Sequence, residues 1–146
     1  MTAINHGLTG VAIGTIVQSP WALPLALLSH FLLDAIPHFG LAKRNTIFLI
    51  YLFFDALATA TLLFWVILTT SQPLLLASCL ILATSPDLVW AYKWFKEVKH
   101  NQPFSSGSGP ITRFHTKIQW FEKPVGIIVE VFWAAAMLLI ITNNLA

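Results

Sequence analysis

Long apolar segments separated by short polar ones constrain this chain more than any single motif does. The pattern predicts five hydrophobic helices, at about residues 3–18, 21–38, 46–70, 73–98 and 124–144. A helix needs roughly 20 apolar residues to cross a bilayer. The third helix is therefore the clearest span, whereas the first two are short. For that first pair, a helical hairpin that does not fully cross the membrane is the competing interpretation.

Composition favours a membrane protein over a soluble one. Of the 146 residues, 57% are hydrophobic and only 10% are charged, whereas a soluble domain has about 25% charged residues. We therefore expect an all-α fold, an integral membrane bundle of about five transmembrane helices plus one interfacial amphipathic helix, in a single domain over residues 1–146. The net charge is only +2, and the basic residues are too few and too scattered for a nucleic-acid-binding surface.

The basic residues all fall on one side of the predicted bundle, within or next to two of its connecting segments. They are Lys43, Arg44, Lys93, Lys96, Lys99, Arg113, Lys117 and Lys123. Lys and Arg concentrate in the cytoplasmic loops of membrane proteins. The pattern therefore predicts an integral membrane protein whose N-terminus faces the cytoplasm and whose C-terminus lies outside.

The segment before the last helix has two parts. Residues 101–109, NQPFSSGSG, are predicted to form a flexible Gly/Ser linker. Residues 110–122 are predicted to form an amphipathic helix, because their apolar residues recur at helical spacing. We expect this helix to lie on an anionic leaflet. Its Arg113, His115 and Lys117 are predicted to lie near a substrate headgroup, with His115 capping the site from the cytoplasmic side.

The stretch SHFLLDAIPHFG, residues 29–40, places three polar groups in an apolar helix. His30, Asp34 and His38 follow the spacing H-x3-D-x3-H. Each step of four residues is slightly more than one helical turn, so the three side chains are predicted to share one face. Because His38 follows Pro37 at a helix end, it is predicted either to support the other two or to lie at the membrane interface.

Four of the six acidic residues lie within apolar segments: Asp34, Asp55, Asp87 and Glu130. Charged groups are costly inside a membrane and are usually functional there. Counted at about 1.5 Å per residue, these acids lie at a depth similar to that of His6 and His30, in the cytoplasmic half of the bundle. Residues of one site must share a depth, so the pattern predicts a single polar site.

A divalent metal ion would account for this combination of residues. Histidine and carboxylate ligands suit zinc, manganese or iron, and four buried carboxylates would be hard to hold without a cation. We predict a metal site, with zinc as the first choice. The predicted ligands are His6, His30, Asp34, Asp87 and His38. A spare carboxylate, Glu130 or Asp55, is predicted to be the general base.

Two stretches resemble a known family. NHGLTGVAIG near the N-terminus and SHFLLDAIPHFG resemble the bacterial membrane-bound metal-dependent hydrolases, which are distantly similar to the zinc-dependent phospholipase C and single-strand nuclease group. The resemblance implies His6, His30 and Asp34 as metal ligands and an inner-membrane location. Ser85-Pro86-Asp87 is similar to the Leu-Pro-Asp element of that family, although that element usually precedes the H-x3-D helix and here follows it.

These observations predict a membrane metal-dependent hydrolase. Its substrate would be an amphiphilic ester, such as a phospholipid or a polyprenyl phosphate, that enters from the cytoplasmic leaflet. Membrane lipid is the expected partner, and the sequence leaves open whether the protein forms a homo-oligomer. Three alternatives remain: a proton- or cation-handling transporter, a haem protein with His6 and His30 as axial ligands, and a non-enzymatic protein with a buried polar network.

Overall fold

Every regular element of the described chain is helical, as predicted. The structure is a computed structural model that describes residues 1–41, 46–99 and 110–145, with side chains described except at 89–99, 110–112 and 116. The helices are α1 (Ala3–Val17), α2 (Ala22–Asp34), α3 (Thr46–Thr69), α4 (Pro73–Lys99), α5 (Pro110–Ile118), the 3-10 turn η1 (Pro124–Gly126) and α6 (Ile127–Leu145). The predicted linker at 101–109 and the basic pair Lys43 and Arg44 lie outside the described residues.

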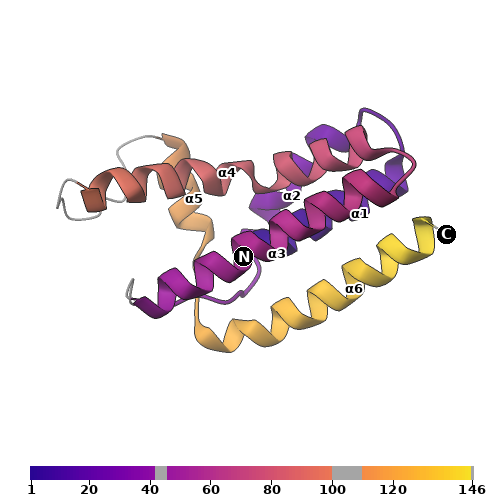
Figure 1. The fold of residues 1–146 in the computed structure, drawn as a ribbon. Helices are drawn as coiled ribbons and strands as arrows, with labels where there is room; N and C mark the ends of the chain where they lie inside the picture. Colours follow the sequence, from indigo (N-terminus) through magenta and orange to yellow (C-terminus); the bar gives the residue numbers. More distant parts are fainter. Residues whose placement is uncertain (42–45, 100–109, 146) are drawn as a thin grey trace.

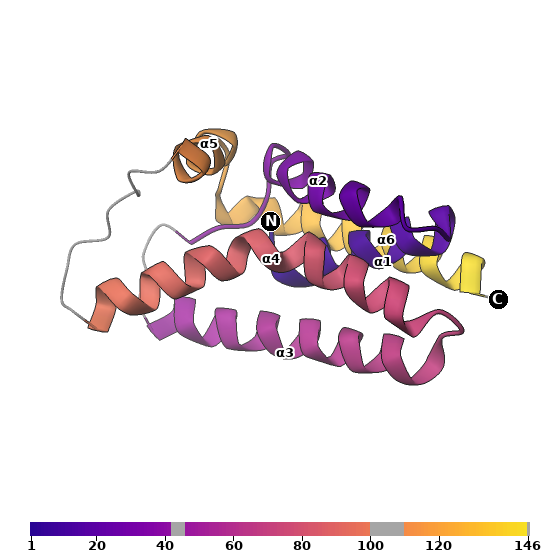
Figure 2. The same cartoon turned by 90° about the horizontal axis from the view of Figure 1, so that it is seen from above.

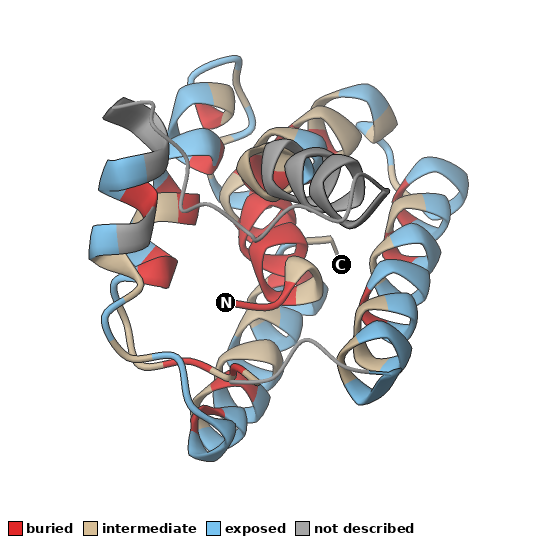
Figure 3. Cartoon of the chain, turned by 90° about the vertical axis from the view of Figure 1, so that its left-hand side faces the viewer, coloured by how far each residue is buried: buried red, intermediate tan, exposed pale blue. Residues whose placement is uncertain are grey.

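Helix α1 is the centre of the bundle. It packs against α2, α3, α4 and α6, and Figures 1 and 2 show these four helices around it. Most of its residues are buried, and Figure 3 shows the buried residues gathered around this N-terminal helix. The outer helices α3 and α6 bury few residues. The molecule therefore has a small core around one helix and an extensive apolar exterior.

Small residues let α1 approach α4 closely. A Cβ atom placed on Gly10 would lie 2.5 Å from the backbone oxygen of Cys79 and 2.9 Å from the Cβ of Ala83. Real Cβ atoms do not come this close to backbone, so only glycine fits here. Such glycine contacts allow helix backbones to pack tightly where no water drives their association. The close approach fixes the face of α4 that α1 meets.

Helix α2 is shorter than predicted. It ends at Asp34, not near residue 38, because Pro37 disfavours helical backbone in the residue before it. The chain then continues as an extended segment that pairs with the segment after α5. His38 donates its amide hydrogen to Phe121 O at 3.2 Å, and Lys123 donates to His38 O at 3.2 Å. This parallel backbone pairing joins the end of α2 to the start of η1.

Among the described residues, two helices are long and apolar enough to cross a membrane, not the predicted five. They are Thr46–Thr69 and Pro124–Leu145. Helices α1 and α2 have 15 and 13 residues, which gives lengths of about 22 and 20 Å against a hydrocarbon core of about 30 Å. The apolar part of α4, Pro73–Leu88, is also short. The sequence overestimates the spans because α1 is short, as predicted, and α2 ends four residues earlier than predicted.

Helix α5 runs across one end of the bundle rather than along it (Figure 1). Figure 2 shows α5 nearly end-on while the other helices lie lengthwise. It ends at Ile118, four residues before the predicted end of the amphipathic segment at 122, and its first residue is Pro110. Among the described helix pairs, α5 packs against α2.

The close approach of α1 and α4 gives a first prediction. Gly10→Ala should lower the free energy of unfolding by about 1–3 kcal/mol, because the new methyl group meets backbone that cannot move aside. Thermal unfolding of the protein in detergent measures this change. Gly7→Ala is the matched control, since its Cβ would lie 3.3 Å from the movable side chain of Leu80. Equal melting temperatures for the two variants would contradict the account.

Candidate metal centre

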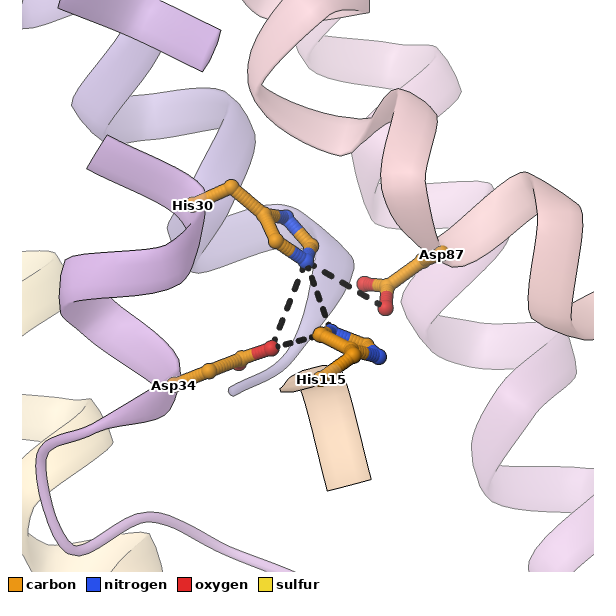
Figure 4. A group of neighbouring side chains, drawn as sticks. All are labelled: His30, Asp34, Asp87 and His115. Carbon is orange, nitrogen blue, oxygen red and sulfur yellow. Dashed lines mark hydrogen bonds and ion pairs between the residues drawn. The ribbon is translucent and has the colours of Figure 1, made fainter. Parts of the chain in front are cut away.

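Four side chains from three helices converge at the end of the bundle that α5 crosses. His30 and Asp34 come from α2, Asp87 from α4 and His115 from α5 (Figure 4). One ligand atom of each lies within 4.8 Å of every other. His30, Asp34 and His115 are buried, whereas 32% of the Asp87 side chain is exposed. This group, called the metal cluster below, has the size and donor chemistry to hold a metal ion.

Local structure explains the pair on α2. His30 and Asp34 are four residues apart, and their Nε2 and Oδ2 atoms lie 3.3 Å from each other. Residues at this spacing lie on the same face of a helix, one turn apart. The face they share is turned towards α1 and α4, because His30 stacks on His6 of α1 and contacts Ala83 O of α4. This part of the site therefore follows from sequence spacing alone.

The distances within the metal cluster are close to those of a metal's ligand shell. Four ligands placed about 2.0–2.2 Å from a tetrahedral zinc ion lie roughly 3.3 Å apart. His30 Nε2 lies 3.3 Å from Asp34 Oδ2 and 3.1 Å from His115 Nε2. His115 Nε2 lies 2.7 Å from Asp34 Oδ2. Asp87 is slightly farther, with its Oδ1 at 3.8 Å from His30 Nε2.

The hydrogen bond of His30 Nδ1 leaves the lone pair of its Nε2 atom directed at the metal cluster. Its Nδ1 lies 2.8 Å from the backbone oxygen of Ala83. A carbonyl oxygen only accepts hydrogen bonds, so Nδ1 carries the hydrogen and Nε2 of the neutral ring has a lone pair. That nitrogen faces carboxylate oxygens, which are acceptors too. A second proton on His30, a hydrogen donated by His115 Nε2 at 3.1 Å, or a cation among the four residues would each reconcile this arrangement.

A proline lies in α4 close to the carbonyl that holds His30. Pro86 has no amide hydrogen, so Leu82 O loses its usual helical donor and the turn before the proline is loosened. The hydroxyl of Ser85 donates to Leu82 O at 3.0 Å in its place. The next carbonyl, that of Ala83, receives His30 Nδ1–H. A backbone partner of this kind orients a ligating histidine and sets its tautomer.

His6 lies against the metal cluster from the central helix. Its ring stacks on that of His30, with the ring centres 4.0 Å apart. Its Nε2 lies 3.2 Å from Asp34 Oδ1 and 3.9 Å from Asp87 Oδ2. His6 therefore contacts Oδ1 of Asp34, whereas His30 and His115 face its Oδ2. The structure thus brings four of the sequence-predicted residues together: His6, His30, Asp34 and Asp87.

Both carboxylate oxygens of Asp34 have several polar partners. Oδ2 accepts a hydrogen bond from Gln119 Nε2 at 3.2 Å besides its contact with His115. Oδ1 lies 2.5 Å from the amino nitrogen of Met1 and 3.2 Å from His6 Nε2. A fully buried carboxylate needs this many partners, because burial without them is very costly. Asp34 therefore joins α1, α2 and the segment around α5.

The structure does not bring His38 to the metal cluster. The prediction that it shares a face with His30 and Asp34 is wrong, because α2 ends before it. His38 Nδ1 instead donates a hydrogen bond to Ile36 O at 2.8 Å. Its backbone pairs with residues 121–123 and lies directly against Gly126. The buried ring thus belongs to the connection between α2 and η1.

Glu130 and Asp55, the two carboxylates predicted as general bases, lie at the N-terminus of α1. Asp55 accepts hydrogen bonds from the amides of Ala3 and Ile4, at 2.8 and 3.0 Å. Glu130 accepts from the amides of Thr2 and Phe39, at 3.3 and 3.0 Å, and from the side chain of Asn5. Both carboxylates satisfy helix-end and loop amides, so the structure gives them a capping role.

The three residues of α5 that were predicted to lie near a headgroup do not share one environment. His115 is buried in the metal cluster, so it stands among the ligand candidates. Arg113 and Lys117 are exposed on the same helix. Gln119 joins the cluster through Asp34 without having been predicted. The spacing His115-x3-Gln119 repeats the H-x3-D step of α2, and that repeat is the one sequence signal for it.

No protein-family model matches this sequence, and no curated protein or solved structure matches it. The assignment of the cluster therefore depends on its own geometry. Two imidazoles and two carboxylates form a donor set that zinc, manganese and iron accept.

The capping role of Asp55 gives a second prediction. Asp55→Ala should lower the free energy of unfolding by about 1–2 kcal/mol, because two amides at the buried end of α1 lose their acceptor. Thermal unfolding measures this cost, and the metal content of the folded protein should not change. Thr61→Ala, at an exposed site on the same helix, is the control. Loss of metal at unchanged stability would instead place Asp55 in the metal site.

Proposed function

We propose that this protein is a membrane-embedded, metal-dependent hydrolase of an amphiphilic ester. The single observation that carries the proposal is the convergence of His30, Asp34, Asp87 and His115 within 4.8 Å. The proposal agrees with the resemblance of the two histidine-containing stretches to membrane-bound metal-dependent hydrolases. Zinc is the proposed ion, since imidazole and carboxylate donors at near-tetrahedral spacing suit it.

The exposed apolar surface supports the membrane part of the proposal. Helix α3 has 6% of its apolar window buried and α6 has 22%, whereas the core helix of a soluble protein is mostly buried. Phe53, Leu68 and Phe132 are 63%, 78% and 73% exposed. Apolar surface on this scale is rare on soluble monomers. Lipid would cover α3 and α6, while the shorter α1 lies inside the bundle and needs no lipid contact.

The chemistry of the site follows from the exposure of its members. A bound divalent ion would polarise a phosphoryl or acyl oxygen and lower the pKa of a nearby water molecule. Asp34, His30 and His115 are buried and would hold the ion in place. Asp87 is partly exposed and lies farther from His30 than Asp34 does. We assign Asp87 to the side from which water and substrate approach, where its carboxylate would orient the attacking water.

The position of the site indicates the class of substrate. The cluster lies at the C-terminal end of α2, beside α5, and Asp87 reaches it from the middle of α4 (Figure 4). An ester group of a phospholipid or a polyprenyl phosphate lies at this level when its chains are in the bilayer. We assign this end to the cytoplasm, because Arg113, Lys117 and Lys123 lie near it and cytoplasmic segments are rich in Lys and Arg. The N-terminus would then lie on the same side.

Metal content gives the third prediction. The wild-type protein, purified in detergent without chelators, should retain about one equivalent of zinc or more. His115→Ala should lose most of it, because one ligand is removed at the edge of the fold. Phe114→Ala, at the exposed neighbouring position, should keep the metal. Elemental mass spectrometry measures all three. A metal-free wild type, even after zinc addition, would favour a buried polar network with a protonated His30.

The hydrolytic activity of the Asp87→Asn variant gives the fourth prediction. The variant should keep its metal and lose about 100-fold or more in turnover, because an amide cannot accept the proton of the attacking water. The assay follows release of the headgroup from phospholipid and polyprenyl phosphate in mixed micelles. Glu122→Gln, a substitution at an exposed carboxylate, is the control. Equal turnover in wild type and Asp87→Asn would remove Asp87 from the mechanism.

A further inference from the structure

We propose that α5 couples an anionic membrane surface to the metal cluster, so that anionic lipid and metal ion bind cooperatively. This inference builds on the proposed function and concerns the regulation of the same site. One side of α5 supplies His115 to the cluster, and the other presents basic and aromatic side chains to the outside. The structure thus places a metal ligand and a lipid-binding surface on one short helix.

Three hydrogen bonds join α5 and its following turn to the end of α2. His115 Nε2 lies 2.7 Å from Asp34 Oδ2, and Gln119 Nε2 donates to the same oxygen at 3.2 Å. Trp120 Nε1 donates to Ala35 O at 2.9 Å. These three hydrogen bonds end on two neighbouring residues. The position of α5 and the presence of His115 in the cluster therefore depend on each other.

The outer side combines charge with exposed aromatic rings. Arg113, Lys117 and Lys123 are exposed, and Phe114 and Trp120 are 54% and 67% exposed. Described acidic side chains near this surface are few, with Glu122 exposed in the following segment. Basic residues attract anionic headgroups, each strengthening membrane binding about fivefold. Tryptophan is enriched at the headgroup level of a bilayer, where the exposed ring of Trp120 would lie.

Position favours a lipid surface over another partner. Helix α5 runs across the bundle end, at a steep angle to α3 and α6 (Figures 1 and 2). If α3 and α6 cross the bilayer, α5 lies nearly parallel to its surface, as interfacial amphipathic helices do. Arg113, Lys117 and Lys123 then face the headgroups of the same leaflet. Charge complementarity commits the proposal to anionic phospholipid.

The shortness of α5 makes the coupling effective. The helix has 9 residues, and isolated helices shorter than about 12–15 residues are marginal in water. Its helical, docked state therefore relies on what it touches. A lipid surface that binds the docked state stabilises it, and so does a metal ion that binds His115. Two ligands that favour one state must strengthen each other's binding, by the same factor in both directions.

The experiment measures zinc affinity of the full chain in two lipid environments. Vesicles of phosphatidylcholine alone are compared with an equal mixture of phosphatidylcholine and phosphatidylglycerol, using competition with a chromophoric chelator. We expect about tenfold tighter zinc binding in the mixture, within the usual range of coupling between sites. The gain should shrink at high salt, because exposed charges are screened.

Variants separate this coupling from simple accumulation of zinc on a charged vesicle. Arg113→Gln/Lys117→Gln should bind zinc in phosphatidylcholine as the wild type does and lose most of the gain in the mixture. Thr61→Ala, at an exposed site on α3, should keep the full gain. If the double variant keeps the gain as well, the effect comes from the vesicle and the coupling through α5 is overturned.

The outcomes also distinguish this inference from the proposed function. Zinc binding of equal affinity in both lipids would leave the metal site intact and overturn the coupling. No zinc binding in either lipid would overturn the metal centre itself, and with it the coupling. Tighter zinc binding in the mixture that disappears in the double variant would support both. The readout is affinity, so it needs no substrate and no turnover.

Discussion

The buried N-terminus of α1 is the constraint on which the rest of this structure depends. The first amides of a helix have no partner within it, and here they lie against α3 and α6. Asp55 of α3 and Glu130 of α6 supply the missing acceptors, to Ala3 and Ile4 and to Thr2. The negative carboxylates also complement the positive end of the helix dipole. These contacts hold the two long apolar helices to the central one.

That arrangement divides the four acids of the apolar segments into two pairs with different tasks. Asp55 and Glu130 are engaged by amides, whereas Asp34 and Asp87 face histidine side chains. The central helix contributes to both groups, since His6 follows the capped amides by a few residues and stacks on His30. The cap and the metal cluster therefore lie at the same end of the bundle. A substitution in the cap would mainly change the stability of the protein, and a substitution in the cluster would mainly change metal binding.

Sequence reasoning found the shared depth of the polar residues but not their grouping. Spacing of four residues was enough to pair His30 with Asp34, because helical geometry makes that contact local. The same rule failed for His38, since Pro37 ends the helix and redirects the chain. It also could not separate a capping acid from a cluster acid, because both kinds need burial. Gln119 was missed because its partner is 85 residues away.

The sequence by itself determined the all-helical class, the end of the molecule where polar groups gather, and the pair on α2. These follow from local periodicity and from the cost of placing charge in apolar segments. Only the tertiary structure decided that two helices and not five are long enough to cross a membrane, that Asp55 and Glu130 cap α1, and that His115 enters the cluster. The capping of α1 and the entry of His115 depend on contacts between residues far apart in the chain, which no local pattern encodes, whereas the number of spans depends on where each helix ends.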